Sequence, residues 1–316
     1  MKKEEHTEQN IGRIVEGYQI LAVLGTGATS QVYQVRENAT GRIYAMKYSI
    51  HTDLLHQESE VLKKLNHPCF PQWIAEGIDS RSAYLIMEYI SGMTLQQLMA
   101  QYPTGMPQQM AAGIGLDVAA GLAYLHDLKP SCIYRDMKAA NVIITTAGRA
   151  RVIDLGALTY WQGGEKTSYR AGTYGYGAPE QFWTGVEITP ACDVYGLGKL
   201  LSFLLTGQDP GKPPYDTALY CSRHADVRGA FRQLLDHCLE QDPQLRYPDA
   251  SFLLPVLSEL AGGRGLRQTG IRTGIATRLK TGIATGIGVR LKEGIRKKSR
   301  YRYIKCIWMS EYERIF

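Results

Sequence analysis

One short segment of the sequence, Ile133–Val142, gathers polar residues among apolar ones. Its polar side chains include Asp136, Lys138 and Asn141, at spacings of two and three residues. A carboxylate in such a loop can accept the proton of a substrate hydroxyl group, and a lysine can neutralise charge on a transferred phosphoryl group. An asparagine oxygen can bind Mg²⁺, a hard cation that prefers oxygen ligands. A merely polar surface loop is the alternative, and the flanking apolar residues argue against it.

A second carboxylate follows at the end of the strand-like run Arg151–Ile153. This residue, Asp154, is followed by Leu155 and Gly156. An aspartate at a strand end before a glycine is a second candidate ligand for a metal ion. The segment Ala178–Glu180 comes next and is expected to open a helix.

A glycine-rich turn near the N-terminus, Gly25–Val32, joins two strand-like runs. Glycine allows a backbone to approach phosphates closely and to offer N–H donors without a side-chain clash. An ordinary hairpin turn is the alternative, because glycine is common in turns. A strand follows the turn and not a helix, which excludes a dinucleotide-binding fingerprint.

Lys47 lies near the end of the next strand-like run, and Glu58 lies in a segment with helical spacing. Together these two side chains could form the ion pair that positions ATP phosphates. Each residue alone has a simpler interpretation, because charged side chains on strands and helices are usually exposed. Glu60 is a rival to Glu58 for the same pairing.

The elements that must position these residues divide the chain into two parts. Strand-like runs around one helix, with Asp53 as its expected N-cap, predict a small first part. The runs are 18–25, 31–37, 43–50, 73–78 and 83–89, and the helix is 53–65. Helical spacing of apolar residues predicts a larger, mainly helical second part. Its helices are expected at 107–126, 190–205, 228–239 and 249–260.

In chain order, these segments resemble the motifs of protein kinases: the Gly-rich loop, the strand lysine, the helix glutamate, H-R-D-x-K-x-x-N, D-F-G and A-P-E. The resemblance runs from Tyr18 to about Leu260, with Asp193 and Arg246 also at family-like places. It implies an α+β, two-lobed protein kinase fold. A small antiparallel-sheet N-lobe with one helix would span about 18–91, and a larger, mainly helical C-lobe about 92–260.

The resemblance also implies a role for each motif residue. Lys47 would hold the α- and β-phosphates of ATP and pair with Glu58, and Asp136 would be the catalytic base. Lys138 would meet the γ-phosphate. The metal ligands would be Asn141 and Asp154, and the metal Mg²⁺, with Mn²⁺ as an alternative.

The implied nucleotide site extends beyond these residues. Val32 and Ala45 would sandwich the adenine, and Glu88–Ile90 would form a hinge that binds it through backbone groups, with Met87 as the gatekeeper. The complete set for nucleotide binding is Gly25, Thr26, Gly27, Ala28, Ser30, Val32, Ala45, Lys47, Glu88 and Ile90.

The sequence departs from the family pattern at four places. Ser30 replaces the third glycine, Tyr134 the catalytic-loop histidine and Leu155 the phenylalanine of D-F-G, while Gly177 precedes A-P-E. None of these changes removes a polar catalytic group, and this argues against an inactive relative.

The resemblance implies a Ser/Thr protein kinase that phosphorylates protein substrates and itself. The Asp-x-Lys pattern favours Ser/Thr over tyrosine kinases, and GTYGYGAPEQF is similar to bacterial Ser/Thr kinases. Arg135 could pair with a phosphorylated Thr167 or Ser168, whereas Thr173 is expected to contact the catalytic loop. The competing hypotheses are a catalytically silent ATP-binding scaffold, an adaptor that works through its tail, and a small-molecule kinase, which the A-P-E segment argues against.

Composition and charge give little information about the reaction, but the charge distribution suggests the kind of partner that the chain binds. Apolar residues make up 44% and charged residues 21% of the 316 residues, as in ordinary soluble proteins. Residues 1–17 are expected to form a polar leader, and 261–316 a basic low-complexity tail. From Gly262 the chain holds 14 Lys/Arg and 3 Asp/Glu, a net charge of +11, whereas residues 1–261 carry −5. The tail therefore suggests an anionic partner, either a membrane surface or a nucleic acid, unless it is simply solvated.

The cysteines and the apolar segments predict a cytoplasmic protein. The six cysteines show no C-x-x-C spacing, which argues against zinc, and their scattering fits a reducing compartment. The N-terminus is polar and lacks an apolar signal segment, and no apolar run is long enough to span a membrane.

Overall fold

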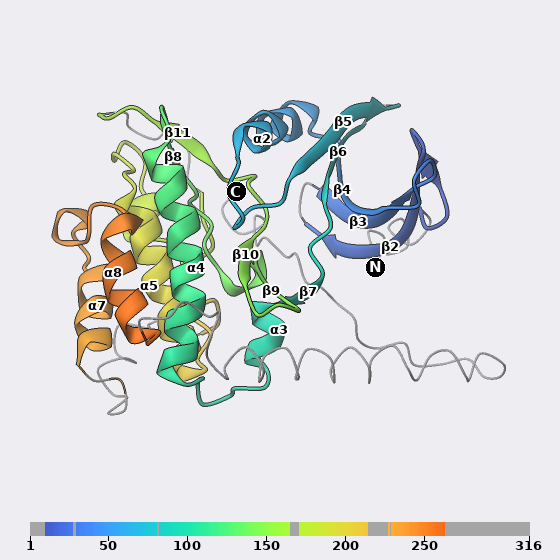
Figure 1. The fold of residues 1–316 in the computed structure, drawn as a ribbon. Coiled ribbons are helices and arrows are strands. Elements are labelled where there is room, and N and C mark those ends of the chain that lie inside the picture. Colours follow the sequence, from blue (N-terminus) through green and yellow to red (C-terminus); the bar gives the residue numbers. More distant parts are fainter. Residues whose placement is uncertain are drawn as a thin grey trace. The chain divides into compact units, whose positions relative to one another are not determined.

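The computed structural model describes residues 10–27, 30–80, 82–164, 171–213, 227 and 229–262. The chain forms two compact units (Figure 1). The N-terminal unit contains the described residues up to Asn66 together with Pro71–Ser91, and the larger unit contains His67–Phe70 and the described residues from Gly92 onward. The predicted α+β class is confirmed, since the first unit is a sheet with one helix and the second is mainly helical. Of the predicted tail, 261–316, only Ala261 and Gly262 are described, and the residues from 263 onward lie outside the described residues.

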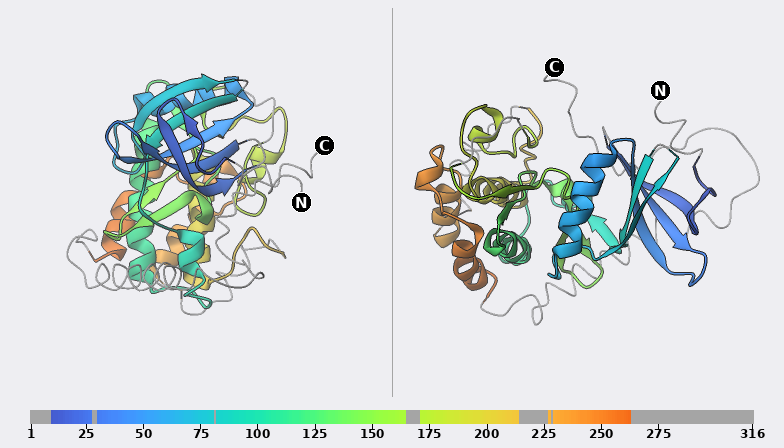
Figure 2. Two further views of the ribbon diagram at one scale, coloured as in Figure 1. Left: turned by 90° about the vertical axis from the view of Figure 1, so that its right-hand side faces the viewer. Right: turned by 90° about the horizontal axis from the view of Figure 1, so that it is seen from above.

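The N-terminal unit is built on one antiparallel sheet with the strand order β1-β2-β3-β4-β6-β5. The strands are β1 (Ile14–Val15), β2 (Tyr18–Thr26), β3 (Ser30–Glu37), β4 (Ile43–Ser49), β5 (Trp73–Asp79) and β6 (Ser82–Glu88). The sheet is strongly curled (Figure 2), as expected from the right-handed twist of strands.

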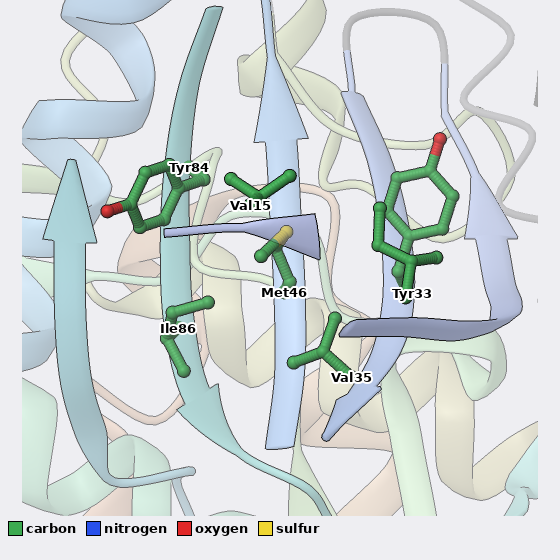
Figure 3. Close-up of a cluster of buried hydrophobic side chains, with 7 residues drawn as sticks. Val15, Tyr33, Val35, Met46, Tyr84 and Ile86 are labelled. Carbon is green, nitrogen blue, oxygen red and sulfur yellow. The ribbon is translucent and has the colours of Figure 1, made fainter. Parts of the chain in front are cut away.

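Alternation along β4 gives the sheet two different faces. Lys47 pairs in register with Val32 of β3 and Leu85 of β6, so these side chains share one face. Helix α2 (Thr52–Lys64) lies on that face, because its Glu58 reaches Lys47. The opposite face carries an apolar cluster (Figure 3), which consists of Val15, Ile20, Tyr33, Val35, Met46, Tyr84 and Ile86.

Strand β1 covers this apolar face and corrects one prediction. Residues 10–17 were expected to belong to a loose polar leader, but Ile14 and Val15 pair with β2. The side chain of Val15 is 2% exposed and packs in the apolar cluster. Full burial of a valine stabilises a fold by about 1.5–3 kcal/mol, so this short strand contributes to the unit.

Helix α2 begins earlier than expected and lacks the predicted cap. Its N-cap residue is His51, which makes no side-chain capping bond, and Asp53 lies within the first turn. There the carboxylate of Asp53 faces the positive end of the helix dipole, and Lys63 and Lys64 lie at the negative end. The charges at both ends therefore favour the helix without a capping side chain.

The larger unit is organised around two long helices, which lie side by side (Figure 1). Its α-helices are α3 (Leu95–Met99), α4 (Gln108–Asp127), α5 (Ala191–Thr206), α7 (Ala230–Cys238) and α8 (Leu254–Leu260). Helix α5 is buried along its whole length, and α4 packs against both α5 and α8. None of the helices in the described part of the chain has the length and apolarity needed to cross a bilayer.

Short 3-10 helices stand at two places where the sequence predicted an α-helix to begin, after Ala178 and after Asp249. The 3-10 helices are η1 (Ala139–Asn141), η2 (Pro179–Phe182), η3 (Pro243–Leu245) and η4 (Ala250–Leu253). The segment 249–260 is not one helix but η4 followed by α8, and Pro255 stands at the start of α8. Proline lacks an N–H donor and is tolerated only in the first turn, so a helix must begin anew there.

Small strands fix the loops of the larger unit. They are β7 (Gly92–Thr94), β8 (Ser131–Ile133), β9 (Val142–Thr145), β10 (Ala150–Val152) and β11 (Thr159–Trp161). In the β9–β10 pair Val142 lies opposite Val152, and the N–H of Ile153 donates to the carbonyl of Asn141. In this antiparallel hairpin the end of β10 lies beside the start of β9. Asp154, the residue after Ile153, therefore comes close to Asn141, the residue before β9.

Candidate active site

A buried ion pair joins β4 to α2 in the N-terminal unit. Lys47 Nζ lies 2.6 Å from Glu58 Oε2, and both side chains are at most one-tenth exposed. Glu60, the rival, pairs instead with Lys63 near the surface. Ala45 lies two residues before Lys47 and therefore on the same face of the sheet.

The glycine-rich turn is described on both of its sides but not at its tip. Gly25 and Thr26 pair with β3, and the N–H of Gly27 donates to the carbonyl of Ser30 at 2.7 Å. Ala28 lies outside the described residues. Ser30, at the third glycine position, begins β3 and pairs with Ser49 of β4.

The predicted hinge begins where β6 ends. The backbone N–H of Glu88 donates to the carbonyl of Gln72, and the Glu88 carboxylate accepts the N–H of Gln72. These two bonds fix the backbone at Glu88. Ile90, two residues further, is buried.

In the larger unit, Asp136 lies in a closed set of polar contacts with two other side chains. The hydroxyl of Thr173 donates to Asp136 Oδ1 at 2.6 Å, and Lys138 Nζ lies 2.8 Å from Asp136 Oδ2. Lys138 Nζ also donates to Thr173 Oγ1 at 2.8 Å. The predicted contact of Thr173 with the catalytic loop is therefore confirmed. A carboxylate that accepts an alcohol hydroxyl, with an ammonium group beside both, is suited to proton acceptance from a hydroxyl.

Asp193 of α5 fixes the backbone just before Asp136 by accepting two of its N–H groups. The carboxylate of Asp193 accepts the N–H groups of Tyr134 and Arg135, both at 2.7 Å, and it contacts His126 at 2.9 Å. Arg135 has φ of 72°, which is sparsely populated for a residue other than glycine. Such a conformation persists only where surrounding bonds hold it, and the two bonds to Asp193 do so.

Tyr134, at the family's histidine position, links the loop to Ile153, the residue between β10 and Asp154. Burial raises the pKa of the Tyr134 phenol well above its ordinary value, and the carboxylates of Asp136 and Asp154 raise it further. The phenol therefore stays protonated and donates to the carbonyl of Ile153 at 2.8 Å. Leu155, at the phenylalanine position of D-F-G, is likewise buried.

The donor atoms around Asn141 fit a metal ion. Asn141 Nδ2 donates to the backbone carbonyl of Asp136 at 2.9 Å and to Asp136 Oδ2 at 3.0 Å. Its Oδ1 is buried and has no hydrogen-bond partner in the described part of the chain. A buried carbonyl oxygen is costly to leave unpaired, and a hard cation is a suitable partner for it. Asp154, the second predicted ligand, has φ of 65° and accepts the N–H of Gly156.

The segment around Ala178–Glu180 is fixed by a buried ion pair. Arg246 donates to both carboxylate oxygens of Glu180, at 2.6 and 2.9 Å. The Arg246 side chain is fully buried and also lies over the ring of Tyr195, 4.8 Å from its centroid. This pair anchors the end of the segment that carries Thr173.

The model of the protein family described as "Protein kinase domain" matches residues 18–253 of the chain. The chain belongs to the protein kinase family. The predicted two-lobed protein kinase fold is confirmed by this match, and protein kinases in general use ATP, a divalent metal ion and protein substrates.

Named relatives of this kinase come from plants and animals. It is 32% identical over 263 residues to "Receptor-like kinase LIP1" of Arabidopsis thaliana, which covers 78% of the chain and 38% of the relative. It is 36% identical over 151 residues to "EPD1-interacting receptor-like cytoplasmic serine/threonine-protein kinase 5D" of Gossypium barbadense, with 46% and 33% covered. It is 31% identical over 199 residues to "Serine/threonine-protein kinase TNNI3K" of Mus musculus, with 60% and 24% covered.

The kinase thus spans less than two-fifths of the length of these three relatives. None of the three is bacterial, so they give no support to the predicted likeness to bacterial kinases.

Within each unit, the structure of the kinase brings together residues that the sequence could only order along the chain. In the larger unit Asp136, Lys138 and Asn141 share direct contacts, and in the N-terminal unit Lys47 meets Glu58. Gln181 was missed, although it contacts the loop that carries Asp136. A buried glutamine next to A-P-E carries no signal in the sequence that would have identified it.

Proposed function

We propose that this kinase transfers the γ-phosphoryl group of ATP to serine and threonine hydroxyls of protein substrates. The contact between Thr173 and Asp136 carries the proposal, because a threonine hydroxyl there donates directly to the carboxylate. Lys138 donates to the same hydroxyl oxygen. A substrate serine or threonine presents the same chemical group, and two of the named relatives are serine/threonine kinases by name.

In the proposed reaction, the substrate hydroxyl oxygen bonds to the γ-phosphorus of ATP, and the bond from that phosphorus to the ADP oxygen breaks. Asp136 orients the hydroxyl and accepts its proton, as general bases do. Lys138 places a positive charge next to the transferred phosphoryl group, where negative charge must be stabilised.

The proposed metal ligands are Asn141 and Asp154. Mg²⁺, when bound, neutralises charge on the phosphate oxygens. The unpartnered oxygen of Asn141 supports this assignment, since it is the atom that the family resemblance assigns to the metal. Mn²⁺ also accepts oxygen ligands and is the alternative.

For nucleotide binding, we propose that Lys47 contacts the α- and β-phosphates and that Glu58 holds it in place. Their buried ion pair supports this role, because a fixed ammonium group loses little freedom when it binds phosphate. The remaining proposed contacts are Gly25, Thr26, Gly27, Ala28 and Ser30 for the phosphates, and Val32, Ala45, Glu88 and Ile90 for the adenine.

The test is to incubate the purified full chain with Mg²⁺ and γ-labelled ATP, beside Lys47→Met and, as a matched control, Lys212→Met. We expect label on phosphoserine and phosphothreonine with the native chain and the control, and at least about a hundredfold less with Lys47→Met, since the phosphates lose their positioning. Measured ATP binding without transfer by the native chain would contradict the proposal and favour a silent scaffold. Label restricted to a small molecule would indicate a small-molecule kinase instead.

Autophosphorylation is part of the proposal. Thr167 and Ser168, the expected sites, lie outside the described residues, whereas the backbone of Arg135 is fixed. Phosphopeptide mapping of the labelled chain checks this expectation, and an unmodified 159–173 segment in active enzyme would contradict it.

For the basic tail, we propose an anionic partner on the strength of its net charge of +11 from Gly262 onward. Binding to duplex DNA or to vesicles with anionic lipids is expected at low salt and should vanish at modest salt. No binding at low salt to either probe would contradict it. The likeness to bacterial kinases and a cytoplasmic location remain predictions.

A further inference from the structure

Gln181 is a buried residue whose side-chain amide makes three hydrogen bonds close to Asp136. It lies in η2 and is 1% exposed. Its Nε2 donates to the carbonyl of Arg135 at 2.8 Å and to the carbonyl of Ala171 at 2.9 Å. Its Oε1 accepts the N–H of Ala178 at 2.9 Å. A neutral primary amide offers two donors and one acceptor oxygen, and each has a partner here.

The partners of Gln181 belong to two segments that must meet for the proposed reaction. Arg135 immediately precedes Asp136, while Ala171 precedes Thr173 by two residues. The hydroxyl of Thr173 donates to Asp136 at 2.6 Å. The amide of Gln181 therefore bridges the backbones of the same two segments whose side chains meet at Asp136.

Two glycines, Gly172 and Gly177, lie against the side chain of Gln181, and a side chain at either position would crowd this region. A Cβ atom added at Gly172 would lie 2.9 Å from Gln181 Nε2 and 3.3 Å from the carbonyl oxygen of Arg135. Gly172 also has φ of 130°, which disfavours side chains. At Gly177 an added Cβ would lie 2.8 Å from Phe182 Cζ and 3.4 Å from Gln181 Oε1. As they are placed, the Phe182 ring and the Gln181 amide leave little room for a side chain at residue 177.

A buried, satisfied amide often serves stability alone. One feature points further in this case. The carbonyls bridged by Gln181 come from the catalytic loop and from the Thr173 segment, so their spacing sets the spacing of the side chains that follow. A displacement of about 1 Å can lower a rate by about a hundredfold when it separates reacting groups.

We propose that Gln181 is a positioning residue that holds the loop carrying Asp136 in register with the segment carrying Thr173. This inference rests on the proposed phosphoryl transfer. It assigns Gln181 no contact with ATP or with the reacting atoms, so its loss should affect the transfer step and spare ATP binding.

The test compares Gln181→Glu and Gln181→Met with the matched control Gln109→Glu in the full chain. Glutamate retains the size of glutamine and the acceptor for Ala178 but loses both donors, and methionine loses all three bonds. Gln109 Nε2 donates to a backbone carbonyl, that of Ala261 at 3.3 Å, and among the described residues no hydrogen bond of its side chain involves the site. Three quantities are measured: kcat on a Ser/Thr peptide, KM for ATP, and amide hydrogen exchange in the peptides that cover 131–138 and 171–178.

Both Gln181 variants are expected to lower kcat by about ten- to a hundredfold and to leave KM for ATP within about threefold of the native value. Amide exchange should accelerate at least about tenfold in both peptides, since buried bonds are lost there, and remain native elsewhere. The control should match the native chain in all three measurements.

Faster exchange throughout the larger unit, or local acceleration with an unchanged kcat, would overturn the proposal in favour of a purely structural role. Native exchange in both peptides would overturn it as well. If the native chain transfers no phosphate, the proposed function fails, and the exchange measurement alone decides whether Gln181 couples the two segments.

Discussion

Replacing Asp136 by asparagine should lower phosphoryl transfer by about 10²- to 10⁴-fold, the usual contribution of a general base. An amide cannot accept the hydroxyl proton, and its nitrogen would face donors that now meet a carboxylate. Lys138 Nζ and Asn141 Nδ2 both lie within 3.0 Å of Asp136 Oδ2. Initial rates with γ-labelled ATP and a Ser/Thr peptide measure the effect, with ATP binding expected to survive.

Asp236→Asn provides the control for this experiment. Asp236 lies on the exposed side of α7, where it forms a loose ion pair with Arg232 at 3.5 Å. Its replacement should leave the rate within about twofold of native, because exposed ion pairs contribute little. A rate for Asp136→Asn within tenfold of native, in folded protein, would remove Asp136 from the role of base.

Replacing Arg246 by methionine should destabilise the kinase by about 3–5 kcal/mol, because the change leaves a buried carboxylate without its partner. Arg246 donates to both oxygens of Glu180 and also to the carbonyls of Ala191, Glu240 and Gln241. Unfolding in urea, followed by intrinsic fluorescence, measures the loss.

Two further variants separate the charge from the packing. Combining Arg246→Met with Glu180→Leu should recover part of the stability, since an apolar pair leaves no unpaired buried charge. Arg232→Met, which removes an ion pair near the surface, should cost no more than about 0.5 kcal/mol. A cost below about 1 kcal/mol for Arg246→Met would show that the buried pair contributes little beyond its own desolvation.

The pairing of Lys47 with Glu58 illustrates what the sequence could predict. Glu58 lies three residues after Leu55 and four before Leu62, and both leucines are buried on the inner face of α2. Helical periodicity therefore places Glu58 on the inner face and Glu60 off it. The prediction left Glu60 as a rival and took Glu58 from the family resemblance, although the helical spacing of Glu58 with Leu55 and Leu62 already distinguishes the two.

Bonds between segments far apart in the sequence could not be predicted in the same way. Asp193 accepts two N–H groups from a loop nearly sixty residues earlier, and Gln181 bridges two backbone carbonyls. Backbone carbonyls are present at every residue, so no residue type marks them as partners. Helix ends were also missed where the backbone itself decides them: α7 begins after Gly229, at φ of 66°, two residues later than predicted.

Strand β1 has a practical consequence for the design of shortened forms of this kinase. A fragment cut at residue 18, where the family match begins, would lose Val15 from the apolar cluster and the bonds that join β1 to β2. It would also lose Asn10, whose amide donates to the hydroxyl of Tyr33. An uncovered apolar sheet face beside an unpaired strand edge is a template for association with a neighbouring molecule. A shortened form of this kinase should therefore keep residues 10–17.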